Sequence, residues 1–343
     1  MISPFLLAFL TQTWTGPAAD VSAFREMSLA EPARRDHGPG TSGGGLATPS
    51  GETMKPGAVS VSLRLDYTQF ERLTPTEIQA MTFETNNGGE GHVDAVRWTL
   101  LETFEVAFGA MEDLQIGFSF GYYRAAGVRE GHLDDTATYD FHEIGDISGM
   151  TDQWITAKVR VLKGAGGSLA LLGGVKLPFG DNSETNHGSA TGSNEPLDPA
   201  LQPGSGAFDF LMGAAYSRYL TEQVTLDTGL SYTRRTKRAD FKMGDLILFG
   251  VAAAYRFTEN VGSYPQSSVF LEVNVRHLFM NREGAHEEEN SGGTALFVSP
   301  GFRVAFSERV SFTISPQIPV AQHLNEEQQK SVFKLAMGIT LSF

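Results

Sequence analysis

The stretch Val59-Ser60-Val61-Ser62-Leu63-Arg64-Leu65-Asp66-Tyr67 alternates strictly between apolar residues at odd positions and polar residues at even positions. Successive side chains of a β-strand point to opposite faces, so this segment predicts a strand with one apolar and one polar face. The same alternation returns up to the end of the chain. It predicts strands over residues 58–70, 97–110, 114–127, 152–163, 168–179, 207–219, 224–237, 245–257, 268–281, 294–306, 310–320 and 331–343.

Two classes of protein contain such strands. In a soluble sandwich or barrel the apolar face points inward, whereas in a membrane barrel it points outward to lipid. The predicted strands are mostly longer than the roughly 5 to 6 residues usual in globular proteins. They also exceed the roughly 9 to 11 residues that cross a tilted apolar band. Strand length therefore favours the membrane barrel.

The connections between the strands alternate in length. Short turns at 111–113, 220–223 and 307–309 are interleaved with acidic or Gly-rich loops at 71–96, 128–151, 180–206, 282–293 and 321–330. The exceptions are a modest outer loop near 239–244 and a longer inner one near 258–267. Outer-membrane barrels have short periplasmic turns and longer extracellular loops, so this rhythm also favours a membrane barrel.

The last strand alternates up to Phe343, the final residue. Such an ending resembles the terminal strand that the barrel assembly machinery recognises, which makes Phe343 a candidate assembly signal. In lipid every backbone N–H and C=O must be paired, so the last strand should pair with the first. We therefore predict an all-β fold, a transmembrane antiparallel β-barrel of about twelve strands with both termini periplasmic. It would lie in the outer membrane of a Gram-negative-type cell, in contact with outer-membrane lipids and lipopolysaccharide.

The N-terminal region differs in composition from the rest. Residues 1–23 combine a short apolar stretch with small residues, which predicts a signal peptide, although no Lys or Arg precedes the apolar stretch. Residues 24–56 include the low-complexity segment His37 to Gly45, which cannot bury a core. We interpret 24–56 as a flexible Gly-rich periplasmic arm or a partial plug of the lumen, and 57–343 as the barrel.

Composition excludes several other classes. The chain has no cysteine and a formal net charge of −14, which argues against a nucleic-acid partner because phosphate binding needs clustered basic residues. No run of eighteen apolar residues occurs, so a helical membrane span is not expected.

Residue parity assigns ten basic and five acidic side chains to the inward face. The candidate lumen and selectivity residues are Arg64, Asp66, Arg97, Glu105, Arg160, Lys176, Asp209, Asp227, Arg256, Glu272, Arg276, Arg303 and Lys334, and Lys158 and Arg235 complete the inward set. Such charges could form a weakly anion-preferring pathway for polar solutes, or a ladder of ion pairs that closes a narrow barrel. Both interpretations stay open. Parity points Glu102 at lipid, and we predict a bulge near Leu100-Leu101 that turns it inward.

Histidines occur mostly in predicted loops with acidic neighbours, at His92, His132, His142, His187, His286 and His323. Imidazole and carboxylate groups can bind divalent metals, but no fixed ligand spacing recurs, so we predict an acidic rim without a metal site. Divalent cations could still bridge these acids to lipopolysaccharide phosphates.

His277 differs from the other histidines because parity places it on the lipid face near the outer rim. Membrane-embedded phospholipases use an outward His with a neighbouring Ser. The adjacent outward positions here offer Asp245 and Thr294 but no serine. We favour a rim histidine at the headgroup level over a catalytic one.

Two motifs resemble a known family. Gly173-Gly174-Val175-Lys176-Leu177-Pro178-Phe179-Gly180 opens a long loop, which ends in Gln202-Pro203-Gly204-Ser205-Gly206 before the strand at Phe208. This arrangement resembles the outer-membrane transporter family named after the meta-pathway of phenol degradation. The resemblance implies passage of small organic, including aromatic, compounds.

We therefore predict a non-enzymatic channel for passive passage of small solutes, which needs no cofactor. The alternatives are a closed-lumen scaffold or binding barrel and, less favoured, a lipid-modifying enzyme at the rim.

Overall fold

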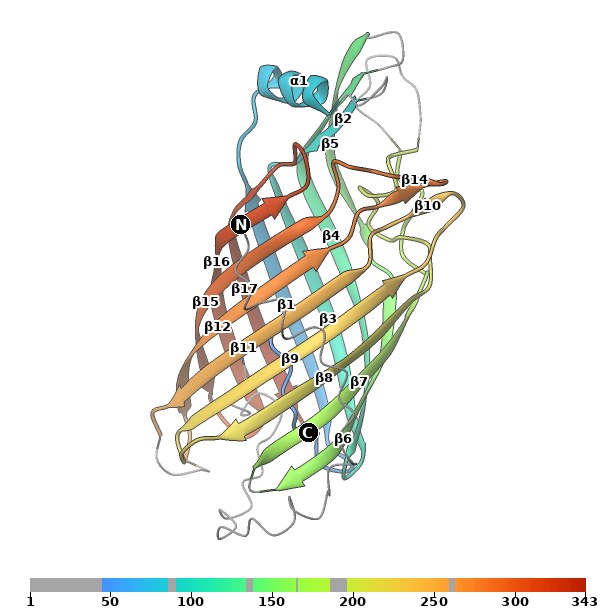
Figure 1. The fold of residues 1–343 in the computed structure, drawn as a ribbon. Helices are drawn as coiled ribbons and strands as arrows, with labels where there is room; N and C mark the ends of the chain where they lie inside the picture. Colours follow the sequence, from blue (N-terminus) through green and yellow to red (C-terminus); the bar gives the residue numbers. More distant parts are fainter. Residues whose placement is uncertain (1–44, 86–90, 134–137, 165, 186–195, 259–262) are drawn as a thin grey trace, which may run out of the picture.

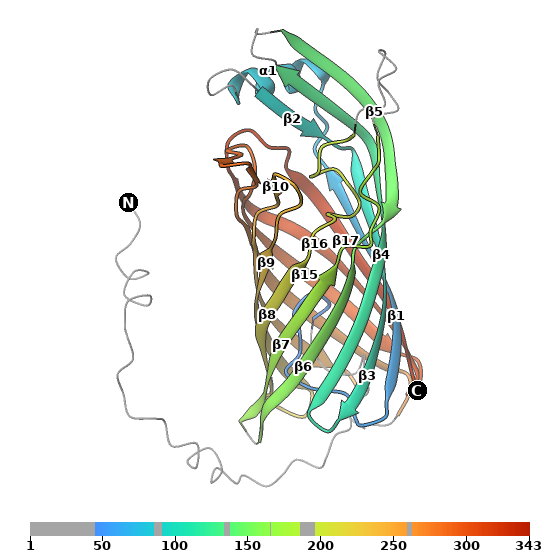
Figure 2. The same ribbon diagram turned by 90° about the vertical axis from the view of Figure 1, so that its right-hand side faces the viewer.

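Twelve antiparallel strands close into a barrel in the computed structural model, which describes residues 45–85, 91–133, 138–164, 166–185, 196–258 and 263–343 (Figures 1 and 2). The barrel strands are β1 (Val59–Phe70), β3 (Trp98–Met111), β4 (Leu114–Leu133), β6 (Gln153–Gly164), β7 (Gly167–Leu177), β8 (Asp209–Tyr219), β9 (Val224–Arg235), β11 (Leu246–Arg256), β12 (Gln266–Leu278), β15 (Gly293–Ala305), β16 (Val310–Leu324) and β17 (Ser331–Ser342). Each coincides with one of the predicted strands, so the predicted fold class is confirmed.

The barrel closes between its first and last strands, as predicted. β1 pairs with β17 from Ser60 opposite Ser342 to Phe70 opposite Ser331, and β1 also pairs with β3. The remaining neighbours follow chain order, and β4 pairs with β6. Closure leaves no free strand edge within the barrel wall, which satisfies the backbone in lipid.

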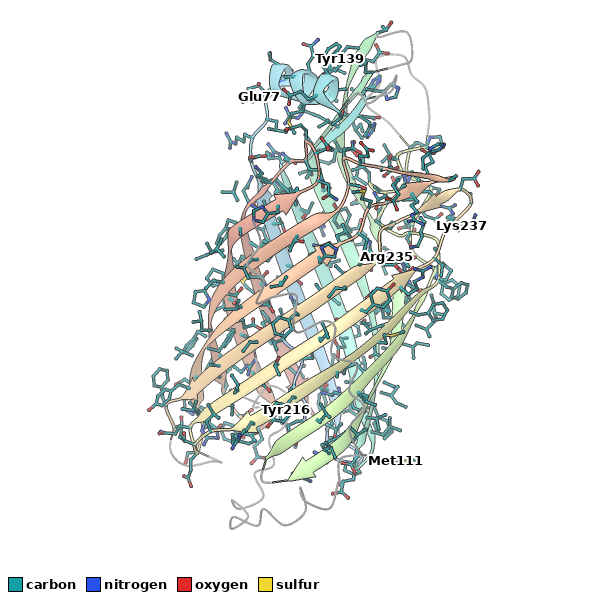
Figure 3. All side chains as sticks on the ribbon, in the orientation of Figure 1. Glu77, Met111, Tyr139, Tyr216, Arg235 and Lys237 are labelled. Carbon is teal, nitrogen blue, oxygen red and sulfur yellow. The ribbon has the colours of Figure 1, made fainter. Side chains whose placement is uncertain are left out.

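The burial pattern is the reverse of that in a soluble protein. Leu171, Met212 and Leu230 are at least half exposed on the outside, whereas Glu272, Ser299 and Ser315 inside the barrel are fully buried. Figure 3 shows side chains projecting from the outer wall along its whole height. An outward apolar surface around a polar interior is stable only in lipid, so the chain is an outer-membrane β-barrel.

The outer loops contain structure that the sequence analysis did not predict. Helix α1 (Pro75–Glu84) and strand β2 (Gly91–Ala95) lie in the predicted loop 71–96, and β5 (Tyr139–Met150) lies in the loop 128–151. β4 continues beyond the rim, where it pairs with β2 and β5; we call this part, together with α1, the outer extension (Figure 2). A small sheet joins β10 (Phe241–Lys242), β13 (Arg282–Glu283) and β14 (His286–Glu287). Five of the histidines expected in loops are therefore in strands: His92, His132, His142, His286 and His323.

The predicted bulge near Leu100-Leu101 is wrong. The register between β1 and β3 is continuous over this region, and Glu102 stands opposite Leu65 on the outward face. Its carboxylate lies 3.5 Å from the guanidinium of Arg124, which in turn lies over the ring of Tyr122. A basic partner on the neighbouring strand compensates the outward charge without a change of register.

Candidate lumen site

The barrel register places most predicted lumen residues on one continuous inward face. Pairs that share this face include Ser62 with Glu105, Lys176 with Asp209, and Ser268 with Arg303. The members inside the barrel wall are Arg64, Asp66, Glu105, Lys158, Arg160, Lys176, Asp209, Asp227, Arg235, Glu272, Arg276, Arg303 and Lys334.

Residues 45–56 lie inside the barrel and contact these inward side chains. We call this segment the arm; residues 1–44, including the predicted signal peptide and the rest of 24–56, lie outside the described residues. The amide groups of Ala47 and Thr48 donate to Glu272 at 3.0 and 2.8 Å. Further along, Gly51 donates to Ser217 at 2.7 Å and Met54 to Gln115 at 3.3 Å. The arm thus runs from mid-lumen to the inner rim.

Glu52 of the arm bridges two strands of the wall. One carboxylate oxygen lies 3.1 Å from Arg160 on β6, and the other accepts a hydrogen bond of 2.6 Å from Ser168 on β7. Arg160 also pairs with Asp113 at 2.7 Å and is almost fully buried. The wall therefore holds Arg160 in position independently of the arm.

Two glycines of the wall make room for the arm. A β-carbon at Gly229 would lie 2.6 Å from Cγ of Pro49, and one at Gly250 would lie 2.6 Å from Oγ1 of Thr48. Both distances are too short for any side chain. These glycines therefore permit the close approach of arm and wall.

The middle of the lumen contains charges of both signs in close proximity. Arg64 forms a bidentate ion pair with Asp66, with both contacts at 2.7 Å, and also donates to the carbonyl of Leu46 in the arm at 3.0 Å. Lys158 interacts electrostatically with Glu105, and Asp227 accepts a short hydrogen bond from Ser217. Arg303 donates to Thr313 at 3.1 Å and to the carbonyl of Gly45 at 3.3 Å.

The outer half of the lumen is lined differently. The register places Leu248 and Arg276 side by side on the inward face, and both are exposed, Leu248 to 42%. Phe297 is on the same face of β15, and the ammonium of Lys334 lies 4.8 Å from the centroid of its ring. An exposed leucine that points inward indicates open space above the arm.

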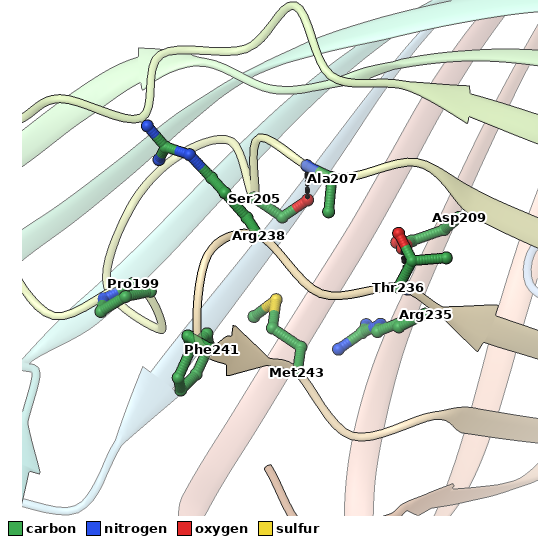
Figure 4. Close-up of a pocket in the computed structure, with 9 residues that line it drawn as sticks. All are labelled: Pro199, Ser205, Ala207, Asp209, Arg235, Thr236, Arg238, Phe241 and Met243. Carbon is green, nitrogen blue, oxygen red and sulfur yellow. Dashed lines mark hydrogen bonds between the residues drawn. The ribbon is translucent and has the colours of Figure 1, made fainter. Parts of the chain in front are cut away.

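A buried ion cluster lies at the outer rim of the barrel. Lys176 lies 3.1 Å from Asp152 and 2.5 Å from Asp209, and all three side chains are almost fully buried. Ser205, in the Pro-Gly-Ser-Gly motif, bonds to Lys176 and to Asp152. The cluster thus ties the end of the 180–206 loop to the barrel wall. Figure 4 shows a small pocket beside it, lined by Pro199, Ser205, Ala207, Asp209, Arg235, Thr236, Arg238, Phe241 and Met243.

Three predicted site residues lie at the ends of the barrel. Arg97 precedes β3 at the outer rim and is exposed, with its β-carbon near Gly127. Arg256 lies at the inner rim, where it donates to the carbonyls of Thr258 and Glu222 at 3.0 and 2.8 Å. Phe343 pairs through its backbone with Val59, at 2.8 and 3.1 Å, and its side chain is exposed.

His277 lies at the outer rim next to Thr294, with its Nδ1 atom 2.8 Å from the threonine hydroxyl oxygen. Its ring packs edge-on against Phe279 at a centroid distance of 4.7 Å. Asp245, the other polar neighbour considered from sequence, is bound by Tyr232, Arg234 and Lys242. Burial opposes the ionisation of Asp245, but these hydrogen bonds hold its pKa below its ordinary value.

His92 in the outer extension contacts two acids, Asp94 at 3.1 Å and Glu130 at 3.4 Å. Burial opposes its protonation, but the charge of Asp94 and then that of Glu130 raise the pKa of His92 to about 10.

Over the part of the chain that the structure describes, no group of three or more acidic or histidine side chains is arranged to hold a metal ion. His187 lies outside that part. Within the same residues, no helix has the length and apolarity to cross a membrane.

Comparison with known proteins agrees with this architecture. A family model described as "Putative MetA-pathway of phenol degradation" matches residues 85–322. The chain belongs to this family. No curated protein matches the chain in sequence. The predicted resemblance is therefore confirmed at the level of the family.

Among solved structures, an outer membrane channel from Pseudomonas putida F1 has a similar fold. Its TM-score is 0.59 at 14% identity, over 85% of this chain and 97% of that chain. The β domain of the Bordetella autotransporter BrkA gives a TM-score of 0.46 at 8% identity, over 84% of this chain and 100% of that chain. At these identities the similarity to the channel establishes the fold.

Proposed function

We propose that this barrel is a channel for passive passage of small organic solutes across the outer membrane, and that the arm is a plug that narrows its inner half. The observation that carries the proposal is the exposure of inward-facing Leu248 and Arg276 above the arm. A barrel filled by its own side chains would bury Leu248, because interiors pack without voids. The open outer half gives a solute somewhere to enter.

The arm is suited to a movable plug because hydrogen bonds attach it to the wall. Its hydrogen bonds to Glu272, Ser217 and Gln115 can be exchanged for bonds to water at a small net cost for each. Gly229 and Gly250, opposite Pro49 and Thr48, let the arm fit closely against the wall and add no side chains that would hold it there. Family membership and the fold shared with the Pseudomonas putida channel agree with this proposal.

Single-channel conductance of the refolded protein in planar bilayers tests both parts. Three chains would be compared: full length, one lacking residues 24–56, and a control lacking residues 24–44 that keeps the arm. We expect discrete conductance steps, with a clear increase only when the arm is removed. Silence from all three, with folding verified by circular dichroism, would contradict the channel and favour a closed scaffold.

The proposal includes no catalytic step. His277 contacts Thr294 and Phe279. Asp245, the other polar residue proposed as its neighbour, is bound by Arg234 instead. We expect no hydrolysis of labelled phospholipid by the refolded protein. Hydrolysis that disappeared in His277→Ala would show that the rim is an active site.

Two partners belong to the proposal as well. The exposed Phe343 side chain at the seam between β1 and β17 is accessible to the barrel assembly machinery. We expect Phe343→Ala to slow assembly in cells, measured by the heat-modifiable mobility of the folded barrel. Lipopolysaccharide would contact the acidic outer extension through divalent cations, and binding that chelators did not weaken would contradict this.

A further inference from the structure

Arg276 on β12 is a lumen cation for which the described part of the chain offers no acidic partner. Within the described residues its guanidinium makes no hydrogen bond and no ion pair. The charged groups that act on it are themselves basic: Arg235 on β9 and Lys334 on β17. Three cations from three strands therefore converge on the outer half of the lumen.

The acids nearest to these cations are already engaged. Asp66, which interacts with Lys334, forms a bidentate pair with Arg64. Asp209 and Asp245, which interact with Arg235, are bound to Lys176 and to Arg234 and Lys242. Among the described residues, the outer lumen therefore has an excess of positive charge.

An apolar wall adjoins this charge. Leu248 is directly opposite Arg276 across the β11–β12 pair, and Leu246 is on the same inward face two residues away. Lys334 is held in place over the ring of Phe297. The arm passes just below this level: Thr48 bonds to Asn274, the inward-facing residue that precedes Arg276 on β12.

We call the outer half of the lumen around these residues the outer vestibule. We propose that it binds organic anions, with the carboxylate of the solute on Arg276 and Lys334 and its apolar body against Leu248. The inference rests on the proposed channel and names its substrate class. A guanidinium recognises a carboxylate in bidentate geometry, and desolvation inside the barrel strengthens the contact. A neutral hydrocarbon would leave the three cations uncompensated, and a small inorganic anion would not use Leu248.

Calorimetry on the full-length protein in detergent tests the site independently of transport. The probes are benzoate, benzyl alcohol as a neutral molecule with the same ring, and acetate as an anion without a ring. We expect benzoate to bind more tightly than either. We expect Arg276→Gln and, separately, Lys334→Gln to weaken benzoate binding about tenfold, as for loss of one charged hydrogen bond. The control Arg218→Gln removes the same charge from the outward face of β8 and should leave binding unchanged.

Equal binding of benzoate and benzyl alcohol would overturn the inference, as would benzoate binding unaffected by both lumen variants. Acetate binding equal to that of benzoate would show a general anion site. It would overturn the proposed contact between Leu248 and the apolar body of the solute. Conductance of the same preparations separates the two proposals. An open pore that does not bind benzoate contradicts only the vestibule site, whereas benzoate binding without conductance contradicts only the channel.

Discussion

The backbone N–H of Thr48 donates to Oε1 of Glu272 at 2.8 Å, joining the arm to a strand 224 residues further along the chain. The N–H of Ala47 donates to the same carboxylate at 3.0 Å. Glu272 is fully buried and also lies within electrostatic reach of Arg303. One buried carboxylate therefore anchors both the arm and a cation of the wall.

Neutralising this anchor should loosen the plug. In Glu272→Gln the arm amides lose a charged acceptor, and charged hydrogen bonds are roughly twice as strong as neutral ones. We expect more frequent or longer open events in single-channel recordings, with the conductance of the open state close to that of the arm deletion. Glu112→Gln, in an exposed inner turn, is the matched control. Identical gating in Glu272→Gln and the native protein would contradict an arm that gates the pore.

Charge selectivity should depend on the outer lumen and not on the inner rim. Arg276 is exposed to the lumen, whereas the guanidinium of Arg256 donates to the carbonyls of two inner turns. Rings of charge set pore selectivity, so Arg276→Gln should lower the anion-to-cation permeability ratio by about twofold or more. Arg256→Gln should change it less. Reversal potentials in a salt gradient measure both, and a larger effect of Arg256→Gln would show that the inner rim controls selectivity.

The buried cluster at the outer rim should be sensitive to loss of its only lysine. In Lys176→Met the carboxylates of Asp152 and Asp209 remain buried and lose the cation between them. Removing one partner of a buried ion pair typically costs about 3 to 5 kcal/mol. We expect a loss of that order in the free energy of unfolding, measured with urea in detergent, together with faster proteolysis of the 180–206 loop.

A matched control for that prediction is Lys163→Met, since Lys163 is exposed and lies 3.8 Å from Glu112. Exposed ion pairs contribute roughly 0 to 1 kcal/mol, so its stability should be close to native. Adding Asp209→Asn to Lys176→Met should recover part of the loss. Equal stabilities of the two lysine variants would mean that the cluster does not hold the rim.

The outer extension should lose stability at high pH. The pKa of His92 is raised from an ordinary value near 6.5 to about 10, so protonation of the folded form favours folding. This contribution is complete below about pH 6.5 and is lost as the pH rises through about 10. Protection of β2 amides against hydrogen exchange, corrected for intrinsic rates, should therefore fall between pH 7 and 10.

Substitution of His92 should remove this dependence. In His92→Gln the protection of β2 should already be low at pH 7 and change little with pH. His286→Gln, on exposed β14, is the control and should behave as the native protein. A fall of equal size in native protein and in His92→Gln would assign the pH dependence to another group.

Some of the structure missed from sequence left a readable signal. Thr74, Pro75 and Glu77 form a capping box at the start of α1: the Glu77 amide donates to Thr74 at 3.2 Å, and its carboxylate accepts from the Thr74 amide at 2.6 Å. This spacing is a known helix-start signature. The extension of β4 beyond the rim left a weaker signal, because no lipid boundary marks where the strand continues.

The period-two alternation determined the number of barrel strands, their order and the face of each lumen residue that lies within a strand, because side-chain direction in a strand depends only on local geometry. Only the tertiary structure decided at which height across the lumen these residues meet. The stagger of a closed barrel brings together residues far apart in sequence, such as Thr48 with Glu272 and Pro49 with Gly229. The position of the arm, the pairing of Glu102 with Arg124 and the cluster of cations around Arg276 all depend on such contacts, and a periodic pattern does not encode them.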